Sequence, residues 1–377
     1  MKNKNQLRVL QVLPALEMGG VERGTIDVAL FLKRKNHFPV VASSGGRLVS
    51  HLRQSAIIHE YMPLHSKNPF VIWANIYRLS DIIKKHGIQI VHARSRAPAW
   101  SAYFAAKKCG VPFMTTFHGT YPFQTKLKKM YNSIMTKGRV VIAVSKFIAQ
   151  EIHQKYGTSQ KKIVTIHRGV DLGTFDANKV TESMVQNMIS EMQIPEDKHI
   201  FLLPGRLTRI KGHEVLFDAV SRMRRDDFIC LIVGSFKNKN YLRELDEQAR
   251  HYGFRDRLYI FNNCKDMATL YALATASISP STRPETFGRT AAEAGAMGCI
   301  VIGSNHGGTK EIIVDEKTGF LFEPEDSIQL AEIMNKVLEL TQEQRKEMQR
   351  NAIEHVRSKF DNETMLAKTL RVYQTLI

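Results

Sequence analysis

Two glutamates, Glu285 and Glu293, lie eight positions apart in the stretch RPETFGRTAAEAGAMG at 283–298. The pattern places Glu285 on a loop after the predicted strand ASISPS (276–281) and Glu293 in the second turn of an alanine-rich helix. The alanines let this helix pack closely on a sheet, so that its amino end can approach an anion. A carboxylate inside the helix can accept hydrogen bonds from a ribose diol, and the loop carboxylate can contact the hydroxyls of an attached sugar. The pair therefore favours a nucleoside diphosphate sugar as ligand.

Two cations occupy another predicted loop at a strand end. In PGRLTRIKGHEVL, Arg206 and Lys211 follow the strand HIFLLPG (199–205) and precede a helix. Five residues apart in a loop, they can converge on one diphosphate, with Arg offering a bidentate fork and Lys a compact charge. Basic loop residues are otherwise most often solvated surface, but the strand end and the neighbouring Gly205 and Gly212 favour a binding role.

The elements that would position these residues alternate between strands and helices. Helical patterns cover 21–35, 69–86 with Asn68 as cap, and 97–108. Buried parallel strands are expected in both halves of the chain, at 7–14, 39–44, 88–93, 112–117, 139–145, 199–205, 228–235, 257–262, 276–281 and 299–304. This βα repetition predicts an α/β protein with two open Rossmann-like sheets, in which ligands bind beyond the carboxyl ends of the strands.

The first such loop carries Gly19 and Gly20. Without Cβ atoms, these residues let backbone amides approach an anion. The same pair fits an ordinary tight turn equally well.

Length and charge predict the division into domains. A chain of 377 residues exceeds the usual size of one core. Its net charge is +20 over residues 1–180 and −2 over 181–377, which sum to +18. The polar stretch 180–197 coincides with this change and is predicted as the junction. We therefore expect a basic domain over 1–180, a second domain over 181–361, and a terminal segment, 362–377.

Composition narrows the class of protein. Four dispersed cysteines argue against a disulfide framework and favour a reducing compartment. Polar residues interrupt the apolar run that a signal peptide would need, and no stretch approaches the roughly 18–20 apolar residues of a transmembrane helix. The 14 histidines show no metal-ligand spacing. A positive field attracts nucleic acid, anionic lipid or phosphorylated small molecules. The lack of a nucleic-acid-binding motif disfavours the first of these.

Five motifs taken together resemble the retaining GT-B glycosyltransferases of family four. They are the glycine pair after the first strand, RGVD at 168–171, the PGRLTRIKG loop, E-x7-E, and HGGTKEII at 306–313. The resemblance spans nearly the whole chain. It implies two Rossmann-like domains facing each other across a cleft, with 362–377 a helix that crosses back to the first domain. It also implies metal-independent, cofactor-free transfer of a hexose from a nucleotide sugar with retention of configuration.

The resemblance assigns roles to individual residues. Glu293 would hold the ribose, Glu285 the donor sugar, and His118, in TTFHGT, would reach that sugar from the first domain. The acceptor hydroxyl would attack on the face that the nucleotide leaves, so no nucleophilic residue is named. His118, Arg206, Lys211 and Glu285 form the expected catalytic set. The donor-binding set is Gly19, Gly20, Arg206, Lys211, Glu285, Phe287, Gly288, Arg289, Thr290 and Glu293.

The acceptor is expected to be lipid-linked. HARSRAPAWSAY (92–103) and TTFHGTYPF resemble enzymes that build lipopolysaccharide or related envelope glycans. Arg94 and Arg96 could bind acceptor phosphates, or could be solvated surface charges. The amphipathic stretch 124–139 could lie on an anionic membrane, at the cytoplasmic face of the inner membrane, or could pack on the core. A soluble glucan or small-molecule acceptor is the alternative, and the sequence does not separate UDP from GDP donors.

Overall fold

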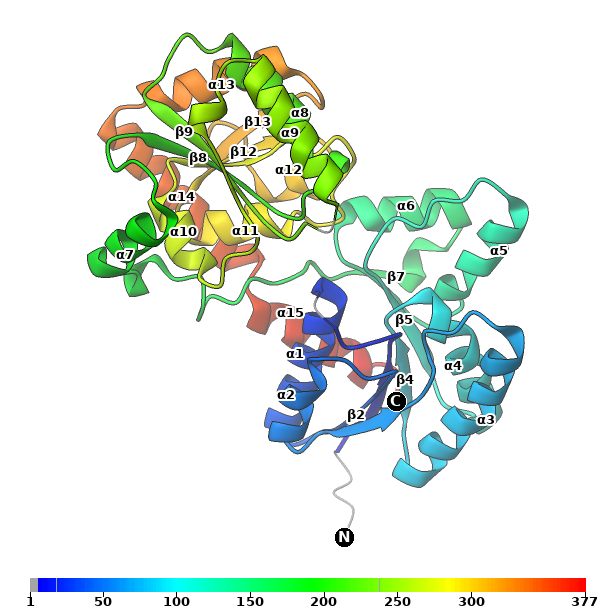
Figure 1. Cartoon of the computed structure of the whole chain (residues 1–377). Coiled ribbons are helices and arrows are strands. Elements are labelled where there is room, and N and C mark those ends of the chain that lie inside the picture. Colours follow the sequence, from blue (N-terminus) through cyan, green and yellow to red (C-terminus); the bar gives the residue numbers. More distant parts are fainter. Residues whose placement is uncertain (1–5, 18, 237) are drawn as a thin grey trace. The chain divides into compact units, whose positions relative to one another are not determined.

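The computed structural model describes residues 6–17, 19–236 and 238–377. Its chain forms two compact units (Figure 1). The first unit comprises the residues up to His167 together with Glu363–Ile377, and the second comprises Arg168–Asn362. Among the described residues, no helix has the length and apolar character required to cross a bilayer.

The first unit is built on a parallel sheet of order β3-β2-β1-β4-β5-β6-β7. Alternate strand residues are buried on opposite faces, as in a sheet covered on both sides. Leu10 and Val12 pack on one face, and Val9 packs on the other. The strands are β1 (Arg8–Val12), β2 (Phe38–Ser43), β3 (Ile58–Tyr61), β4 (Ile90–Ala93), β5 (Phe113–Phe117), β6 (Val141–Ala143) and β7 (Ile163–Thr165).

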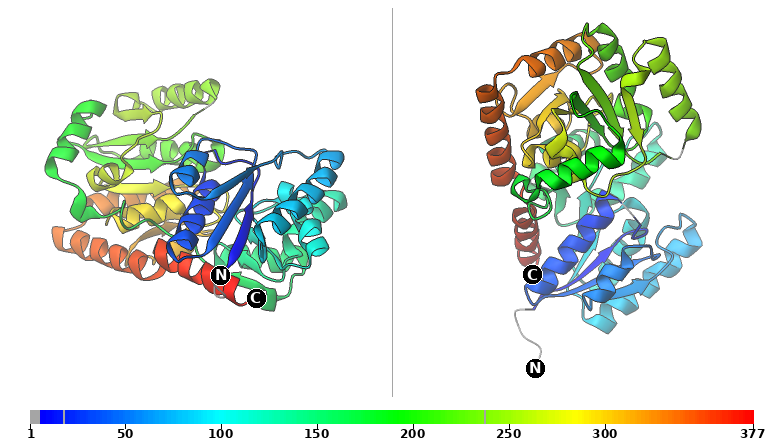
Figure 2. Two further views of the ribbon diagram at one scale, coloured as in Figure 1. Left: turned by 90° about the horizontal axis from the view of Figure 1, so that it is seen from below. Right: turned by 60° about the vertical axis from the view of Figure 1, so that its left-hand side comes forward.

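Helices cover both faces of this sheet (Figures 1 and 2). One face carries α3 (Pro69–His86), α4 (Arg96–Cys109) and α6 (Lys146–Tyr156). The other carries α1 (Gly20–Arg34), α2 (Val49–Gln54) and the last helix, α15 (Asn362–Gln374). Asn68 caps α3 by accepting a hydrogen bond from the Phe70 amide at 2.9 Å, which confirms the predicted cap.

The second unit repeats this layered plan around a parallel sheet of order β10-β9-β8-β11-β12-β13. Its strands are β8 (His199–Pro204), β9 (Phe228–Val233), β10 (Leu258–Phe261), β11 (Ala276–Ser279), β12 (Ile300–Ser304) and β13 (Gly319–Phe322). On one face lie α8 (His213–Arg222), α9 (Lys239–His251) and α13 (Ser327–Glu339). On the other lie α7 (Glu182–Met192), α10 (Met267–Leu273), α11 (Arg289–Ala296) and α14 (Gln342–Lys359). The predicted two-domain Rossmann-like α/β fold is confirmed.

The first unit ends earlier than the predicted boundary at residue 180. Residues 168–180 belong to the second unit. Val170 is buried and pairs with Asp361, and Leu172 and Val180 pack on the same core. The charge change at 180 follows surface residues and therefore did not locate the change of core.

The polar junction expected at 180–197 is largely the helix α7. Thr181 caps it by accepting from the Met184 amide at 3.3 Å, while Met188 and Ile189 enter the core of the second unit. Among the strands, β3, β7 and β13 were not predicted. β3 and β7 are half-buried edge strands without a long apolar run.

Candidate functional site

Three loops of the second unit converge at the carboxyl ends of β8, β11 and β12. The Thr282 amide donates to the Ile210 carbonyl at 3.0 Å, which joins the first loop to the second. The Gly308 amide donates to the Glu285 carbonyl at 2.7 Å, and His306 Nε2 donates to the Ser281 carbonyl at 2.8 Å. Because β8 lies between β9 and β11, these loops meet where strand order reverses, the usual ligand position in such sheets.

Lys211 and Glu285, predicted on separate loops, form an ion pair at the centre of this site. Lys211 Nζ lies 2.6 Å from Glu285 Oε1, and Ser281 Oγ donates to the same oxygen at 2.8 Å. Burial acts to raise the pKa of Glu285, but Lys211, Ser281 and the charge of Arg206 together hold it below its usual range. Glu285 is therefore ionised at neutral pH, beside two cations, of which Arg206 is exposed.

Glu293 lies within α11 and is buried, with 9% of its side chain exposed. Arg289 Nε donates to Glu293 Oε1 at 2.7 Å, and the Tyr271 hydroxyl donates to Oε2 at 3.5 Å. Burial raises the pKa of Glu293 despite the opposing charge of Arg289. A carboxylate in this position can accept hydrogen bonds from a ligand hydroxyl, and a ligand that donates two would offset the cost of its burial.

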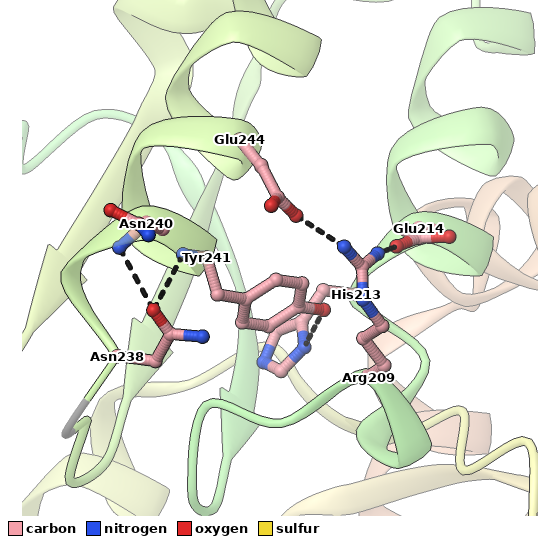
Figure 3. Close-up of polar contacts among 7 residues, drawn as sticks. All are labelled: Arg209, His213, Glu214, Asn238, Asn240, Tyr241 and Glu244. Atoms are coloured by element: carbon pink, nitrogen blue, oxygen red, sulfur yellow. Dashed lines mark hydrogen bonds and ion pairs between the residues drawn. The ribbon is translucent and has the colours of Figure 1, made fainter.

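A cluster around Arg209 fixes the loop that carries Lys211 (Figure 3). Arg209 donates to Glu214 of α8 at 2.6 Å and to Glu244 of α9 at 2.5 Å, and its guanidinium lies 5.1 Å from the Tyr241 ring centroid. The buried His213 contacts the Tyr241 hydroxyl through Nδ1 at 3.2 Å. Burial and Lys211 lower the pKa of His213 to about 4, so this ring is neutral at physiological pH. Sequence spacing gave no sign of this cluster, because it joins residues 209–214 to residues 241–244.

The remaining donor-binding candidates of this unit surround the start of α11. Gly288 is the N-cap residue, with φ +89°, and Thr290 and Arg289 form the first turn. Phe287 differs from the prediction, since its side chain is 3% exposed and packs edge-on against Phe360 at 5.7 Å. The core holds that ring, which leaves only the Phe287 backbone for a ligand.

In the first unit, Gly19 and His118 occupy loop positions after β1 and β5, and Gly20 is the first residue of α1. Gly19 has extended backbone, φ 179°, and precedes α1, which begins at Gly20. His118 directly follows β5 and is half-buried. Because these residues belong to a different unit from Glu285 and Glu293, their predicted contact with a shared donor stays a prediction.

Arg94 and Arg96 are held by the first unit itself. Arg94 is 4% exposed and donates to Gln11 Oε1 at 3.3 Å, and burial lowers the pKa of its guanidinium. Arg96 donates to Asn132 Oδ1 at 2.8 Å and covers the Tyr121 ring at 4.3 Å. One of the two expectations was that these residues are solvated surface charges, and neither of them is. Burial also disfavours Arg94 as a direct ligand of an acceptor phosphate.

Within the described ranges, no cluster of three or more His, Cys, Asp or Glu side chains has the arrangement of a metal site. The four cysteines are free thiols, and burial raises the pKa of both Cys230 and Cys299 to about 12.

Gly212→Ala should disrupt the site far more than Gly253→Ala. Both glycines have φ +73°, so both substitutions incur the left-handed penalty of about 1–2 kcal/mol. A Cβ at Gly212 would lie 1.7 Å from the Pro280 carbonyl oxygen, whereas one at Gly253 meets nothing within 4 Å. We expect the unfolding free energy of Gly212→Ala to fall by a further ~1–3 kcal/mol, measured by urea denaturation. Equal losses of unfolding free energy in the two variants would mean that the loop carrying Gly212 can move away from Pro280 without strain.

Comparisons with known proteins agree with this geometry. Residues 185–355 match the family model for Glycosyl transferases group 1, and residues 18–174 match that for Glycosyltransferase Family 4. The chain is 41% identical to a glycosyltransferase from Rickettsia africae ESF-5, with 99% of both chains covered and a TM-score of 0.93. The HepE protein of Anabaena, in complex with UDP and glucose, has a TM-score of 0.85 at 20% identity, over 98% of this chain and 100% of that one.

Among curated proteins, the D-inositol 3-phosphate glycosyltransferase of Xylanimonas cellulosilytica is 25% identical over 264 residues. That match covers 66% of this chain and 63% of that enzyme, less than two thirds of its length. The Rickettsia similarity extends over the whole chain, and the two family models match its two halves in order. The chain belongs to the group 1 glycosyltransferases, with a GT-B fold.

Proposed function

We propose that this protein transfers a hexose from a nucleoside diphosphate sugar to a hydroxyl of a lipid-linked or lipopolysaccharide-type acceptor, with retention of configuration. The observation that carries the proposal is the Lys211–Glu285 pair, 2.6 Å apart beside Arg206, at the carboxyl ends of β8 and β11. It places a carboxylate suited to sugar hydroxyls next to cations suited to a diphosphate. HepE, which shares the fold, is recorded with UDP and glucose, and this supports a nucleotide-sugar donor.

In the proposed mechanism, the diphosphate leaves toward Arg206, Lys211 and the amide groups at the start of α11. As the sugar–phosphate bond breaks, negative charge grows on the leaving oxygen and these groups stabilise it. The acceptor hydroxyl attacks on the same face, and its proton passes to the departing phosphate oxygen. Glu285 orients the sugar, and Glu293 holds the ribose. His118 would contact the sugar from the first unit.

The proposed acceptor and location follow from the basic first half of the chain. Its charge of +20 over residues 1–180 suits a phosphate-bearing acceptor at an anionic surface. We propose that the protein works in the cytoplasm, peripherally on the inner membrane. A soluble glucan or small-molecule acceptor would instead leave activity unchanged when membranes are removed.

A thermal-shift panel with EDTA present tests the donor part of the proposal. The ligands are UDP, GDP, ADP, UDP-glucose, UDP-N-acetylglucosamine and GDP-mannose. A ligand at 100 times its Kd adds about 2.7 kcal/mol to the folded state and raises Tm. We expect one nucleotide and its sugars to raise Tm without divalent metal, which identifies the base. Absence of any shift at millimolar ligand would contradict the donor site, and a shift seen only with added Mg²⁺ would contradict metal independence.

A further inference from the structure

The helix α3 of the first unit exposes three large aromatic side chains on its solvent side. Phe70, Trp73 and Tyr77 of α3 are 82%, 61% and 44% exposed. Their spacing of three and four residues places them on one side of the helix. The opposite side of α3 supplies buried Leu79 and Ile83 to the core. This helix is therefore apolar on both sides, and core packing accounts for only one of them.

Exposed apolar side chains also lie on α4 and on α5 (Lys126–Ser133), two further helices of the first unit, both labelled in Figure 1. Phe104 of α4 is 41% exposed and stacks on Trp100 at 6.3 Å. Trp100 in turn stacks on Tyr131 at 6.4 Å and donates to its carbonyl at 3.2 Å. These contacts join α4 to α5, and Lys108 of α4, over the Tyr77 ring, joins α4 to α3. We call the exposed apolar side chains of the three helices the aromatic face: Phe70, Trp73, Tyr77, Phe104, Leu127 and Met130.

Contrary to the prediction from the sequence pattern, residues 124–139 do not form one helix with a single apolar side. The α-helix ends at Ser133, and Ile134, 1% exposed, packs in the core. Leu127 and Met130 are 74% and 58% exposed. The apolar residues of this stretch thus divide between the core and the aromatic face.

The charge around the aromatic face is predominantly positive, with Asp81, exposed on α3 one turn beyond Tyr77, as an exception. From residue 82 to residue 150 the sequence contains 12 Lys and Arg and no Asp or Glu. Lys126, Lys128 and Lys129 lie on α5, and Lys108 Nζ of α4 sits 3.9 Å from the Tyr77 ring centroid. In the second unit, by contrast, the exposed large apolar residues are scattered singly among the described residues, as at Tyr252 and Ile328.

We propose that the aromatic face docks on an anionic lipid surface. Trp and Tyr, with an apolar ring and a polar edge, favour the level of the lipid headgroups. Lysines beside them attract anionic headgroups, each by about fivefold in binding constant. A protein partner of ordinary charge balance would not call for this excess of lysines beside exposed aromatic rings. The inference extends the proposed lipid-linked acceptor by naming the surface that brings the enzyme to it.

The fluorescence of Trp73 can report directly on contact between α3 and lipid, because the sequence contains only two tryptophans. In Trp100→Phe, all tryptophan emission comes from Trp73. Vesicles of phosphatidylcholine with about 30% phosphatidylglycerol, which gives a negative surface potential, should shift this emission to shorter wavelength, and brominated lipids should quench it. Trp73→Phe, which retains only Trp100, should respond much less. Unaltered Trp73 emission in the presence of bound vesicles would overturn the proposal.

Co-sedimentation with the same vesicles separates the aromatic and basic contributions. We expect Phe70→Ser/Trp73→Ser/Tyr77→Ser and Lys126→Glu/Lys128→Glu each to weaken vesicle binding at least tenfold. The controls, Tyr252→Ser/Ile328→Ser and Lys346→Glu/Arg350→Glu, alter exposed positions of the second unit and should bind like wild type. Wild-type binding by the α3 variant would overturn the proposal, as would a shift from dimer to monomer in sedimentation velocity or stronger binding of tRNA than of vesicles.

The donor panel separates failure of this inference from failure of the proposed function. The proposed ribose and diphosphate contacts, Glu293, Arg206 and Lys211, lie in the second unit, and the α3 variant leaves that unit unaltered. A protein that binds UDP or GDP but no vesicles retains the enzymatic proposal and loses the docking surface. A protein that binds vesicles but no nucleotide retains the docking surface and loses the enzymatic proposal.

Discussion

Replacing Arg206 with Ala and Lys211 with Met should lower kcat at least about 10²–10³-fold while leaving the protein folded. Both cations are proposed to act on charge that develops only as the diphosphate leaves, so their loss should affect kcat more than KM. Arg206 is exposed, so its removal should not destabilise the fold. The measurement is steady-state kinetics with the donor identified by thermal shift, together with Tm of each variant.

The ion pair of Lys211 requires its own control. Lys211→Met leaves Glu285, with 25% of its side chain exposed, without its cation at 2.6 Å. The double variant Lys211→Met/Glu285→Gln removes both charges and should recover the lost stability but not the activity. Arg243→Ala, on the surface of α9, is the charge-matched control and should turn over like wild type. Activity within threefold of wild type in the Arg206/Lys211 variant would remove both residues from the diphosphate site.

Glu293→Gln should raise the Kd for the bound nucleotide about 10–100-fold, with Tm unchanged or higher. The ribose would lose a hydrogen bond to a charged acceptor, worth about 1.5–3 kcal/mol. Calorimetric titration gives the Kd. An unchanged Kd would refute the ribose role of this carboxylate.

The pH dependence of Tm provides a second measurement on Glu293. Its pKa in the folded protein lies above the ordinary value of about 4.3. The folded state therefore holds the proton more tightly than the unfolded state, and stability falls as pH rises from about 4.3 through the raised pKa. Glutamine does not ionise, so the Tm of Glu293→Gln relative to wild type should increase over that interval. A constant difference between pH 4 and pH 7 would show that the ionised carboxylate is not destabilising.

Sequence pattern predicted ten of the strands because each is an apolar run closed by turn residues. The three strands it missed, β3, β7 and β13, all lie at the outer positions of their sheets. Edge strands need less apolar character, and periodicity therefore underestimates them. The boundary near residue 168 was missed for a similar reason, since surface charge does not report which core a segment such as Val170 enters.

At the site, loop positions could be predicted but side-chain partners could not. The placement of Glu285 and Lys211 at strand ends follows from βα alternation, and the sheet order β9-β8-β11 then brings them together. The ion pair of Arg209 with Glu244 joins residues 35 positions apart, and only the folded sheet determines their approach. The burial of Arg94 and Phe287 likewise depends on packing that spacing does not report.

The last helix has a consequence for how this chain is made. Tyr373 of α15 is fully buried in the first unit, and its hydroxyl lies 2.7 Å from Nδ1 of the buried His92. A ribosome completes α15 only after the whole second unit has been synthesised. Until then the N-terminal sheet has an uncovered apolar surface around Val9, Ile90 and Ile142. The second unit is continuous in sequence and can finish folding first. The N-terminal unit can complete its core only when α15 has been made. During that interval its uncovered apolar surface is a binding site for a chaperone.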